Sequence, residues 1–306
     1  MKLSILRWLF ATVCLCTGPI AARAQLSVYE GFEYTVGSSL PPAESSGFGW
    51  SGGWYNNADT LNNSGSRGLV IAGSLDTPPG MIAAGNHVAM STFTASSERL
   101  LAISNDNESA GINTNADSVT FFSVVGRVSG NSWSFGLYSD RGRIDNPVVA
   151  FSLTGGNATM RLYDAFPYES ADGAVTRTIA SGVSGTFLWV GRLETSAGDD
   201  RLDSWIYTNL DNVPALMPAL QAAPAPYVVV PGSNVNIYDV DAVIDRVGFY
   251  LNSGSALDEI RIGGDWQSVT ASVSAVPEPS TYAVLLGGAA LALVIIRRRF
   301  RPTPNC

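Results

Sequence analysis

Two neighbouring stretches indicate the fold of this chain: residues 119–128, VTFFSVVGRV, and residues 132–138, SWSFGLY. The first is rich in β-branched and aromatic side chains and has turn residues at both ends, as a strand does. In the second, Trp133, Phe135 and Leu137 alternate with small residues, which places them on one face of a strand. Both stretches therefore predict β-strands.

The same strand pattern repeats along residues 148–153, 159–163, 186–193, 202–207 and 246–251. Turn clusters such as TGGN at 154–157 and AGDD at 197–200 separate the strands. Between the two termini no stretch shows the 3.6-residue apolar stripe of a helix, and the four prolines of residues 213–226 (VPALMPALQAAPAP) predict a surface connection. Many short strands predict an all-β, two-sheet antiparallel sandwich of jelly-roll type over residues 25–270.

Three further stretches carry a resemblance to a known group of proteins. Residues 29–34 (YEGFEY), 49–54 (GWSGGW) and 257–266 (LDEIRIGGDW) resemble surface proteins with concanavalin A/LamG-like domains. Residues 186–193 (TFLWVGRL), followed by Gly198-Asp199-Asp200, are similar to the long back-sheet hairpin of that group. The resemblance implies a lectin-like jelly-roll whose first and last strands lie side by side, which would bring Phe32 near Ile260.

Residues 1–24 read as a signal peptide for the secretion machinery. Lys2 and Arg7 supply the positive region, residues 8–16 form a short apolar core, and Gly18-Pro19 breaks the helix. Small residues at Ala22 and Ala24 predict cleavage before Gln25. The apolar core is too short for a retained anchor, and no small residues precede Cys14 or Cys16 in the order a lipoprotein requires.

The C-terminal segment predicts membrane anchoring and sorting. Residues 271–279 form a linker that ends in Pro277-Glu278-Pro279, and the two prolines keep this triplet extended. Residues 280–296 are predicted to cross the inner membrane, although their uncharged part is short, about 22 Å as a helix. The basic tail, residues 297–306, is predicted to stay cytoplasmic. Its stop-transfer residues are Arg297, Arg298, Arg299 and Arg301.

The order of triplet, short apolar segment and arginine cluster resembles the PEP-CTERM sorting signal of Gram-negative bacteria. The resemblance implies that an exosortase-type processing enzyme recognises Pro277, Glu278 and Pro279. It also implies that the preceding domain is then released or transferred to the cell surface or extracellular matrix. The simpler interpretation is a linker before an ordinary anchor.

Composition restricts the partners of the exported part. Residues 25–275 contain no cysteine and no lysine, so no disulfide stabilises them. Seven of the 18 basic residues lie in the terminal segments, which leaves 11, and only Glu278 of the 26 acidic residues lies outside, which leaves 25. The resulting net charge of −14 predicts no nucleic-acid partner and a surface able to hold divalent cations.

The sequence shows no catalytic motif. A retaining glycoside hydrolase needs two carboxyl groups about 5–5.5 Å apart. Asp239 and Asp241 have suitable strand spacing but no third carboxylate at the required offset, and Asp258 and Glu259 are expected on opposite faces. We therefore interpret all four as solvated turn and edge residues. His87, the only histidine, is expected to be a partly exposed polar residue, and it offers neither a zinc site nor a triad.

Two features favour binding. Asn234, Asn236, Asp239 and Asp241 supply oxygen ligands of the kind that calcium takes, although without EF-hand spacing. Trp50, Trp54 and Tyr55 have a composition that would stack on a sugar, but aromatic residues in a sandwich more often form the core. The alternative to the calcium site is an exposed Asn/Asp loop, and the alternative to the sugar site is a packed aromatic core. We predict no metal or other cofactor.

We predict an exported surface or matrix protein with a non-catalytic, lectin-like passenger that has an adhesive or structural role. Polysaccharide is its candidate ligand. The competing prediction is a divergent glycoside hydrolase or polysaccharide lyase on a jelly-roll fold. Turnover of a polysaccharide, abolished by replacing Asp239 or Asp241, would distinguish the two.

Overall fold

The computed structural model describes residues 26–41, 46–54, 68–81, 85–90, 95–102, 111–129, 132–139, 147–163, 174–222 and 233–271. The chain divides into two compact units, Met1–Ala271 and Ser272–Cys306, and all described residues belong to the first. The predicted signal peptide, the sorting triplet, the membrane segment and the arginine cluster lie outside the described residues. In the described part, no helix is both long and apolar enough to cross a membrane.

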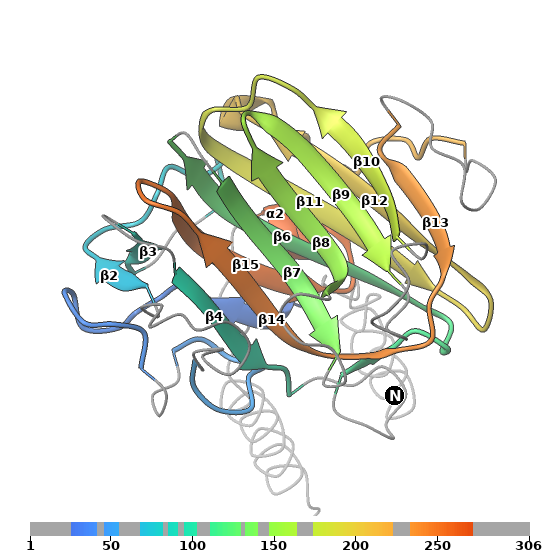
Figure 1. The fold of residues 1–306 in the computed structure, drawn as a ribbon, viewed down its shortest axis with the longest axis horizontal. Coiled ribbons are helices and arrows are strands. Elements are labelled where there is room, and N and C mark those ends of the chain that lie inside the picture. The colour runs from blue at the N-terminus through green and yellow to red at the C-terminus, as the bar shows by residue number, and fades with distance from the viewer. Residues whose placement is uncertain are drawn as a thin grey trace, which may run out of the picture. The chain divides into compact units, whose positions relative to one another are not determined.

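The described residues form two antiparallel sheets (Figure 1). The eight-stranded back sheet has the order β13 (Val235–Asp239), β12 (Asp199–Tyr207), β11 (Gly185–Thr195), β6 (Ser118–Val128), β15 (Ala256–Gly263), β3 (His87–Ala89), β2 (Leu69–Ile71), with β1 (Leu26–Glu30) paired to β15. The seven-stranded front sheet has the order β10 (Ala174–Ala180), β9 (Asn157–Tyr163), β8 (Pro147–Thr154), β7 (Ser132–Ser139), β14 (Val243–Leu251), β4 (Ala95–Leu100), with β5 (Ile112–Asn113) paired to β14. This arrangement confirms the predicted all-β jelly-roll sandwich.

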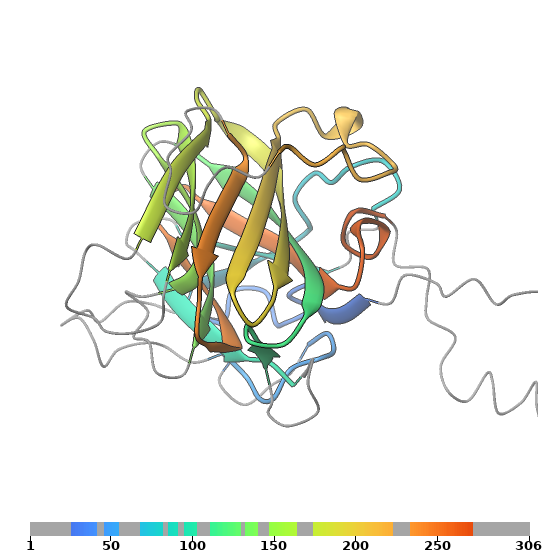
Figure 2. The same cartoon turned by 90° about the vertical axis from the view of Figure 1, so that its right-hand side faces the viewer.

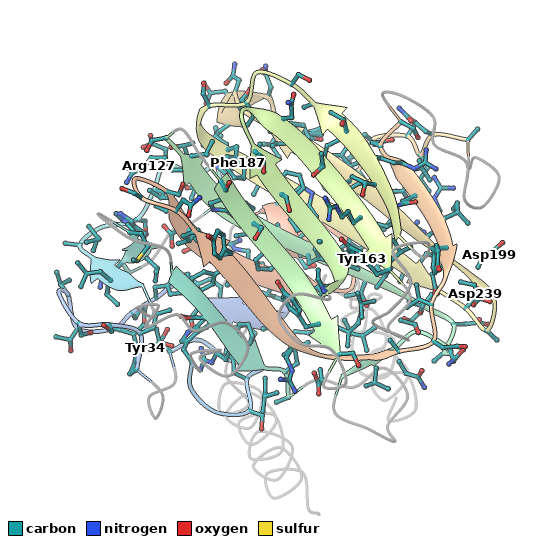
Figure 3. The ribbon with its side chains drawn as sticks, viewed as in Figure 1. Tyr34, Arg127, Tyr163, Phe187, Asp199 and Asp239 are labelled. Carbon is teal, nitrogen blue, oxygen red and sulfur yellow. The ribbon has the colours of Figure 1, made fainter. Side chains whose placement is uncertain are left out.

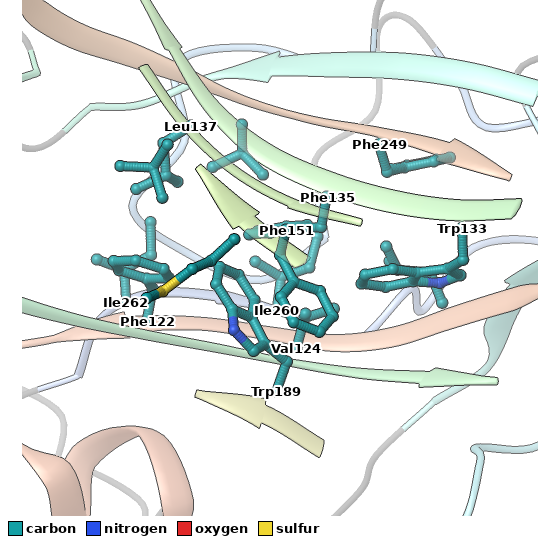
Figure 4. Packing of buried hydrophobic residues seen from close by; sticks show 14 of the residues in the cluster. Phe122, Val124, Trp133, Phe135, Leu137, Phe151, Trp189, Phe249, Ile260 and Ile262 are labelled. Atoms are coloured by element: carbon teal, nitrogen blue, oxygen red, sulfur yellow. The ribbon is translucent and has the colours of Figure 1, made fainter. Parts of the chain in front are cut away.

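Aromatic side chains from both sheets fill the space between them (Figure 4). Trp133, Phe135 and Leu137 are fully buried, as their alternation predicts. Trp189 of the back sheet stacks on Phe151 of the front sheet, with ring centroids 4.5 Å apart. Such ring pairs add about 0.5–1.5 kcal/mol beyond the area they bury. The close packing of rings across the two sheets therefore holds them together.

The first and last strands of the sandwich lie side by side, as the resemblance to lectin-like domains implies. β1 pairs with β15, and Glu30 lies opposite Ile260, two residues before Phe32. β11 and β12 form the long hairpin of the back sheet, from Leu188 opposite Tyr207 to Glu194 opposite Arg201. Residues that are distant in sequence therefore meet at the centre of the back sheet.

A further layer covers the outer face of the back sheet (Figure 2). It contains the helix α2 (Trp266–Thr270), the short 3-10 helix η2 (Leu210–Asn212) and the proline-rich residues 213–222. The indole Nε1 of Trp266 donates to Pro214 O at 2.9 Å, and Ser123 Oγ of β6 donates to Val269 O at 2.7 Å. These bonds fasten the layer to the sheet. The described residues 213–222 contain no strand and no helix, as the prolines predict.

Helix α2 was not predicted from the sequence. It has five residues, which is too few to show a 3.6-residue period. A capping box begins it: Asp265 accepts from the backbone of Ser268, and the Ser268 side chain accepts from the backbone of Asp265. Asp265 and Ser268, three residues apart, were the signal in the sequence for the start of this helix.

Candidate functional site

The outer face of the front sheet, here called the front face, is the candidate binding surface. It faces the viewer in Figure 1, while the covering layer lies behind the back sheet in Figure 2. Its residues are those that alternate with the core-facing ones along each strand. In the described part they include Ser134, Gly136, Ala150, Ser152, Thr159, Arg161, Tyr163, Thr176, Thr178, Gly248 and Tyr250.

Small residues lie in register across the middle of the front face. Gly248 pairs with Gly136, Gly136 pairs with Ala150, and Ala150 pairs with Arg161. All three small residues are nevertheless buried. Side-chain atoms of Pro147 and Tyr138 lie 3.0 Å from where a Cβ of Gly136 would stand, so neighbouring side chains cover the middle of this row. Arg161, at the end of the row, is exposed.

Hydrogen-bonding and aromatic groups flank this row. Ser134 and Ser152 are partly exposed, and the Tyr250 side chain opposite Ser134 is 38% exposed. Arg161 donates to the hydroxyl of Tyr163, labelled in Figure 3, at 2.7 Å. Hydroxyl groups, a guanidinium and phenol rings can bind sugars, because they offer hydrogen bonds to hydroxyl groups and flat surfaces to apolar ring faces.

The described front face does not present a pair of carboxylates. Among the side chains described on the front-sheet strands, Asp245 is the only carboxylate, and its Oδ1 lies 3.0 Å from Nε of Arg246. Acid–base hydrolysis of a glycoside requires two carboxyl groups. The front face, as far as it is described, has groups for binding but lacks that pair.

Asp239, the last residue of β13, and Asp241, two positions after it, are exposed, as expected. Asp199 lies opposite Asp239 in the sheet, and Figure 3 labels both. Asp200 is buried, and burial together with Asp239 and Asp241 raises its pKa to about 7, although Ser196 N and Val240 N donate to it. Within the described ranges, no group of three or more His, Cys, Asp and Glu side chains could hold a metal.

The other two predicted calcium ligands have different surroundings. Asn236 is buried, and its Oδ1 accepts from Nε of Arg177 at 3.5 Å, on the inner side of β10. Asn234 is partly buried, and its backbone N–H donates to Oε1 of Gln221. The structure therefore does not gather the four side chains at one point. Calcium binding by this segment stays an untested alternative to the prediction of no cofactor.

The interpretation of Asp258 and Glu259 as solvated residues is wrong, because both are fully buried. A bulge interrupts β15 at this point, and Glu259 has a left-handed φ of 50°. Asp258 accepts from Leu75 N at 2.8 Å, and Glu259 accepts from Arg261 at 2.9 Å. Burial, followed by the charge of Glu259, raises the pKa of Asp258 to about 8. These contacts connect neighbouring segments of the protein.

The expectation that His87 is partly exposed is also wrong. The residue is buried on β3, and its Nδ1 lies 2.6 Å from the carbonyl oxygen of Gly73. This nitrogen must carry the proton, because a carbonyl can only accept. Burial lowers the pKa of the ring, which favours the neutral form. His87 thus holds the segment between β2 and β3.

The predicted tryptophans belong to a buried polar cluster. Trp54 is fully buried, in agreement with the core alternative, and its Nε1 donates to Glu30 at 3.2 Å. Trp50 is partly exposed, and the guanidinium of Arg99 lies 4.8 Å from the centre of its ring. Tyr55 lies outside the described residues. Sequence reasoning missed the buried ion pair of Glu30 and Arg99.

The comparisons with known proteins address the sorting segment and the fold separately. Residues 275–299 match the PEP-CTERM protein-sorting motif. A chain with this motif is exported from a membrane-anchored precursor, and the motif is associated with exosortase processing. No curated protein matches the sequence.

Several solved structures are similar to the sandwich. An endo-β-1,4-glucuronan lyase from the fungus Trichoderma reesei is 12% identical, with a TM-score of 0.40 over 80% of this chain and 98% of that chain. An endo-1,3-β-glucanase from Streptomyces sioyaensis is 9% identical, with a TM-score of 0.41 over 81% of this chain and 98% of that chain. A legume lectin-like domain from Entamoeba histolytica is 8% identical, with a TM-score of 0.34 over 65% of this chain and 85% of that chain. At this level of similarity neither activity nor ligand transfers to the chain.

Proposed function

We propose that this protein acts at the cell surface or in the extracellular matrix as a non-catalytic, lectin-like adhesive or structural protein. Its passenger binds an exopolysaccharide through the front face. An exosortase-type enzyme recognises Pro277, Glu278 and Pro279 after export. The proposal joins the sorting motif at residues 275–299 to the binding groups of the front face.

The observation that carries the binding proposal is the difference between the two outer faces of the sandwich. The back sheet is covered by α2, η2 and residues 213–222, whereas the described front face has exposed polar and aromatic side chains around a row of small residues. A solvated sheet face is normal in an antiparallel protein. The added feature here is that phenol, hydroxyl and guanidinium groups lie together on adjacent strands, a combination that suits a sugar chain.

The test uses the passenger, residues 25–271, in affinity electrophoresis with neutral and uronate-containing polysaccharides. Arg161→Ala and Tyr250→Ala should each weaken binding about tenfold, the effect of losing roughly 1.4 kcal/mol of contact energy. Val119→Ala is the matched control, because Val119 is also 38% exposed but lies on the back sheet.

Retarded migration that is lost in both front-face variants, and kept in the Val119 variant, supports the proposal. Binding that is the same in all three variants would place the ligand elsewhere. Release of oligosaccharides from any polysaccharide in the panel would show an enzyme and contradict the non-catalytic assignment.

A further inference from the structure

We propose that residues 213–222 form a membrane-contact loop, which rests on the lipid surface while the precursor is anchored. The contacting side chains are Leu216, Met217 and Leu220. The partner is the boundary between headgroups and acyl chains of the bilayer that holds the C-terminal segment. This inference rests on the anchored precursor and does not depend on glycan binding.

The loop exposes an unusual set of side chains for an acidic exported protein. Leu216 is 72% exposed, Met217 36% and Leu220 38%, all within five positions. No charged residue occurs from Val213 to Ala222, although the exported part has a net charge of −14. Pro214 and Pro218 restrict the backbone, so little conformational freedom remains to be lost on contact. A small, uncharged apolar projection suits the interfacial region of a membrane.

The loop is fastened next to the C-terminal end of the folded domain. Pro214 O accepts from Nε1 of Trp266, the first residue of α2, at 2.9 Å. The Trp266 ring also packs edge-on against Trp205 of β12, with centroids 5.3 Å apart. At the other end of the loop, Arg201 donates to Gln221 O at 2.8 Å. Both the loop and α2 lie on the outer side of the back sheet in Figure 2.

Few residues connect this layer to the predicted membrane segment. Arg261 donates to Ala271 O at 2.6 Å, which fixes the last described residue. Ten residues separate Ala271 from Tyr282, where the uncharged stretch begins. Fully extended, ten residues span at most about 35 Å. A domain of this size is about 45 Å across by the usual scaling of radius with length. The linker therefore limits Ala271 to at most about 35 Å from the start of the uncharged stretch, a distance shorter than the width of the domain.

Anchoring makes a weak contact sufficient. Three partly exposed apolar side chains would bind a membrane poorly from solution, as a single short lipid chain does. A tethered domain, however, searches only the volume that its linker allows, so the contact becomes intramolecular and its effective concentration rises. Because the loop has no charge, the contact does not depend on ion pairs with lipid headgroups.

The experiment uses the full chain, reconstituted without processing enzyme into vesicles of phosphatidylethanolamine with a minor share of phosphatidylglycerol. Cys14, Cys16 and Cys306 are replaced by serine, and a single cysteine for an environment-sensitive fluorophore is introduced as Leu216→Cys. Tyr250→Cys on the front face is the matched control. We expect the label at position 216 to emit at shorter wavelength and to lose most of its emission to lipid-borne quenchers, while the label at position 250 does neither.

A second variant tests the tether. Inserting 20 flexible residues after Ala271 makes the linker about three times longer and lowers the effective concentration about fivefold. Quenching at position 216 should fall accordingly, with the fold unchanged by circular dichroism. Water-like emission at position 216, or quenching at position 250 instead, would overturn the proposal. So would a wavelength shift that persists without lipid and grows with protein concentration, which would indicate contact between two copies.

Discussion

Replacing Glu30 with alanine should destabilise the passenger strongly, because its carboxylate is the centre of a buried polar cluster. It forms an ion pair with Arg99, and both side chains are fully buried. Further donors to the same carboxylate are Phe32 N at 2.7 Å, Tyr34 OH at 2.9 Å, Trp54 Nε1 at 3.2 Å and Ser46 Oγ. Burial raises the pKa of Glu30, and the charge of Arg99 and these donors oppose that shift.

The magnitude follows from what the substitution leaves behind. Arg99 would remain buried with Gly52 O, Ser46 O and the Tyr34 hydroxyl as neutral partners. Removing one member of a buried ion pair typically lowers the free energy of unfolding by about 3–5 kcal/mol. The free energy of unfolding of a domain is about 5–15 kcal/mol in total, so Glu30→Ala would remove a large fraction of it. The lost contacts are made by the last residue of β1, the strand that pairs with β15 in the back sheet.

Urea unfolding of residues 25–271, followed by tryptophan fluorescence, measures the effect. The matched control is Glu194→Ala, which breaks a 2.8 Å ion pair with Arg192 at a side chain that is 47% exposed. Exposed pairs contribute about 0–1 kcal/mol. The double variant Glu30→Leu/Arg99→Met should recover part of the loss, because no buried charge is left, although the hydroxyl and indole donors stay unpaired. The reasoning fails if Glu30→Ala and Glu194→Ala lower the stability equally.

Three further predictions concern pH, metal and sorting. The pKa of Asp258 is about 8 in the folded protein against an ordinary 3.8, so the unfolded state ionises first as the pH rises. Unfolding free energy should therefore fall between about pH 4 and pH 8, by at most about 1.4 kcal/mol per unit, and Asp258→Asn should flatten that slope in pH-dependent urea titrations. If the segment from Asn234 to Asp241 holds calcium, a chelator should lower the melting temperature, and an unchanged temperature would exclude a stabilising ion. Replacing residues 277–279 with alanine should leave a full-length, membrane-bound precursor in the host, and wild-type surface protein that still carries Arg297 by intact mass would contradict exosortase-type processing.

The strands were predictable because their signal is local. Trp133, Phe135 and Leu137 needed only the two-residue period to be placed on one face, and they are fully buried. The surface position of residues 213–222 followed equally from their prolines, which restrict the backbone without any tertiary contact.

The buried charges were not predictable, because their partners are far apart in sequence. Arg99 lies 69 residues from Glu30, and Leu75 lies 183 residues from Asp258. No local pattern indicates that a carboxylate will find such a donor, so exposure was the default expectation. The bulge at Glu259 was not predictable either, because its left-handed φ of 50° is a conformation that non-glycine residues seldom adopt.

The front face was missed for a related reason. Gly136, Ala150 and Gly248 look like weak points of three separate strands, and only the register of the sheet places them in one row. Their alignment is therefore a property of the pairing, which the sequence of any one strand does not contain.

The two proposals assign the opposite sides of the sandwich to different tasks. The side that carries α2, Ala271 and the loop at residues 213–222 leads directly into the sorting segment. If that side rests on the membrane, the front face, on the other sheet, points away from the lipid. A polysaccharide outside the cell could then reach Arg161 and Tyr250 while the precursor is still anchored. Glycan binding before processing would thus require no reorientation of the domain, and release by the processing enzyme would leave the same face available in the matrix.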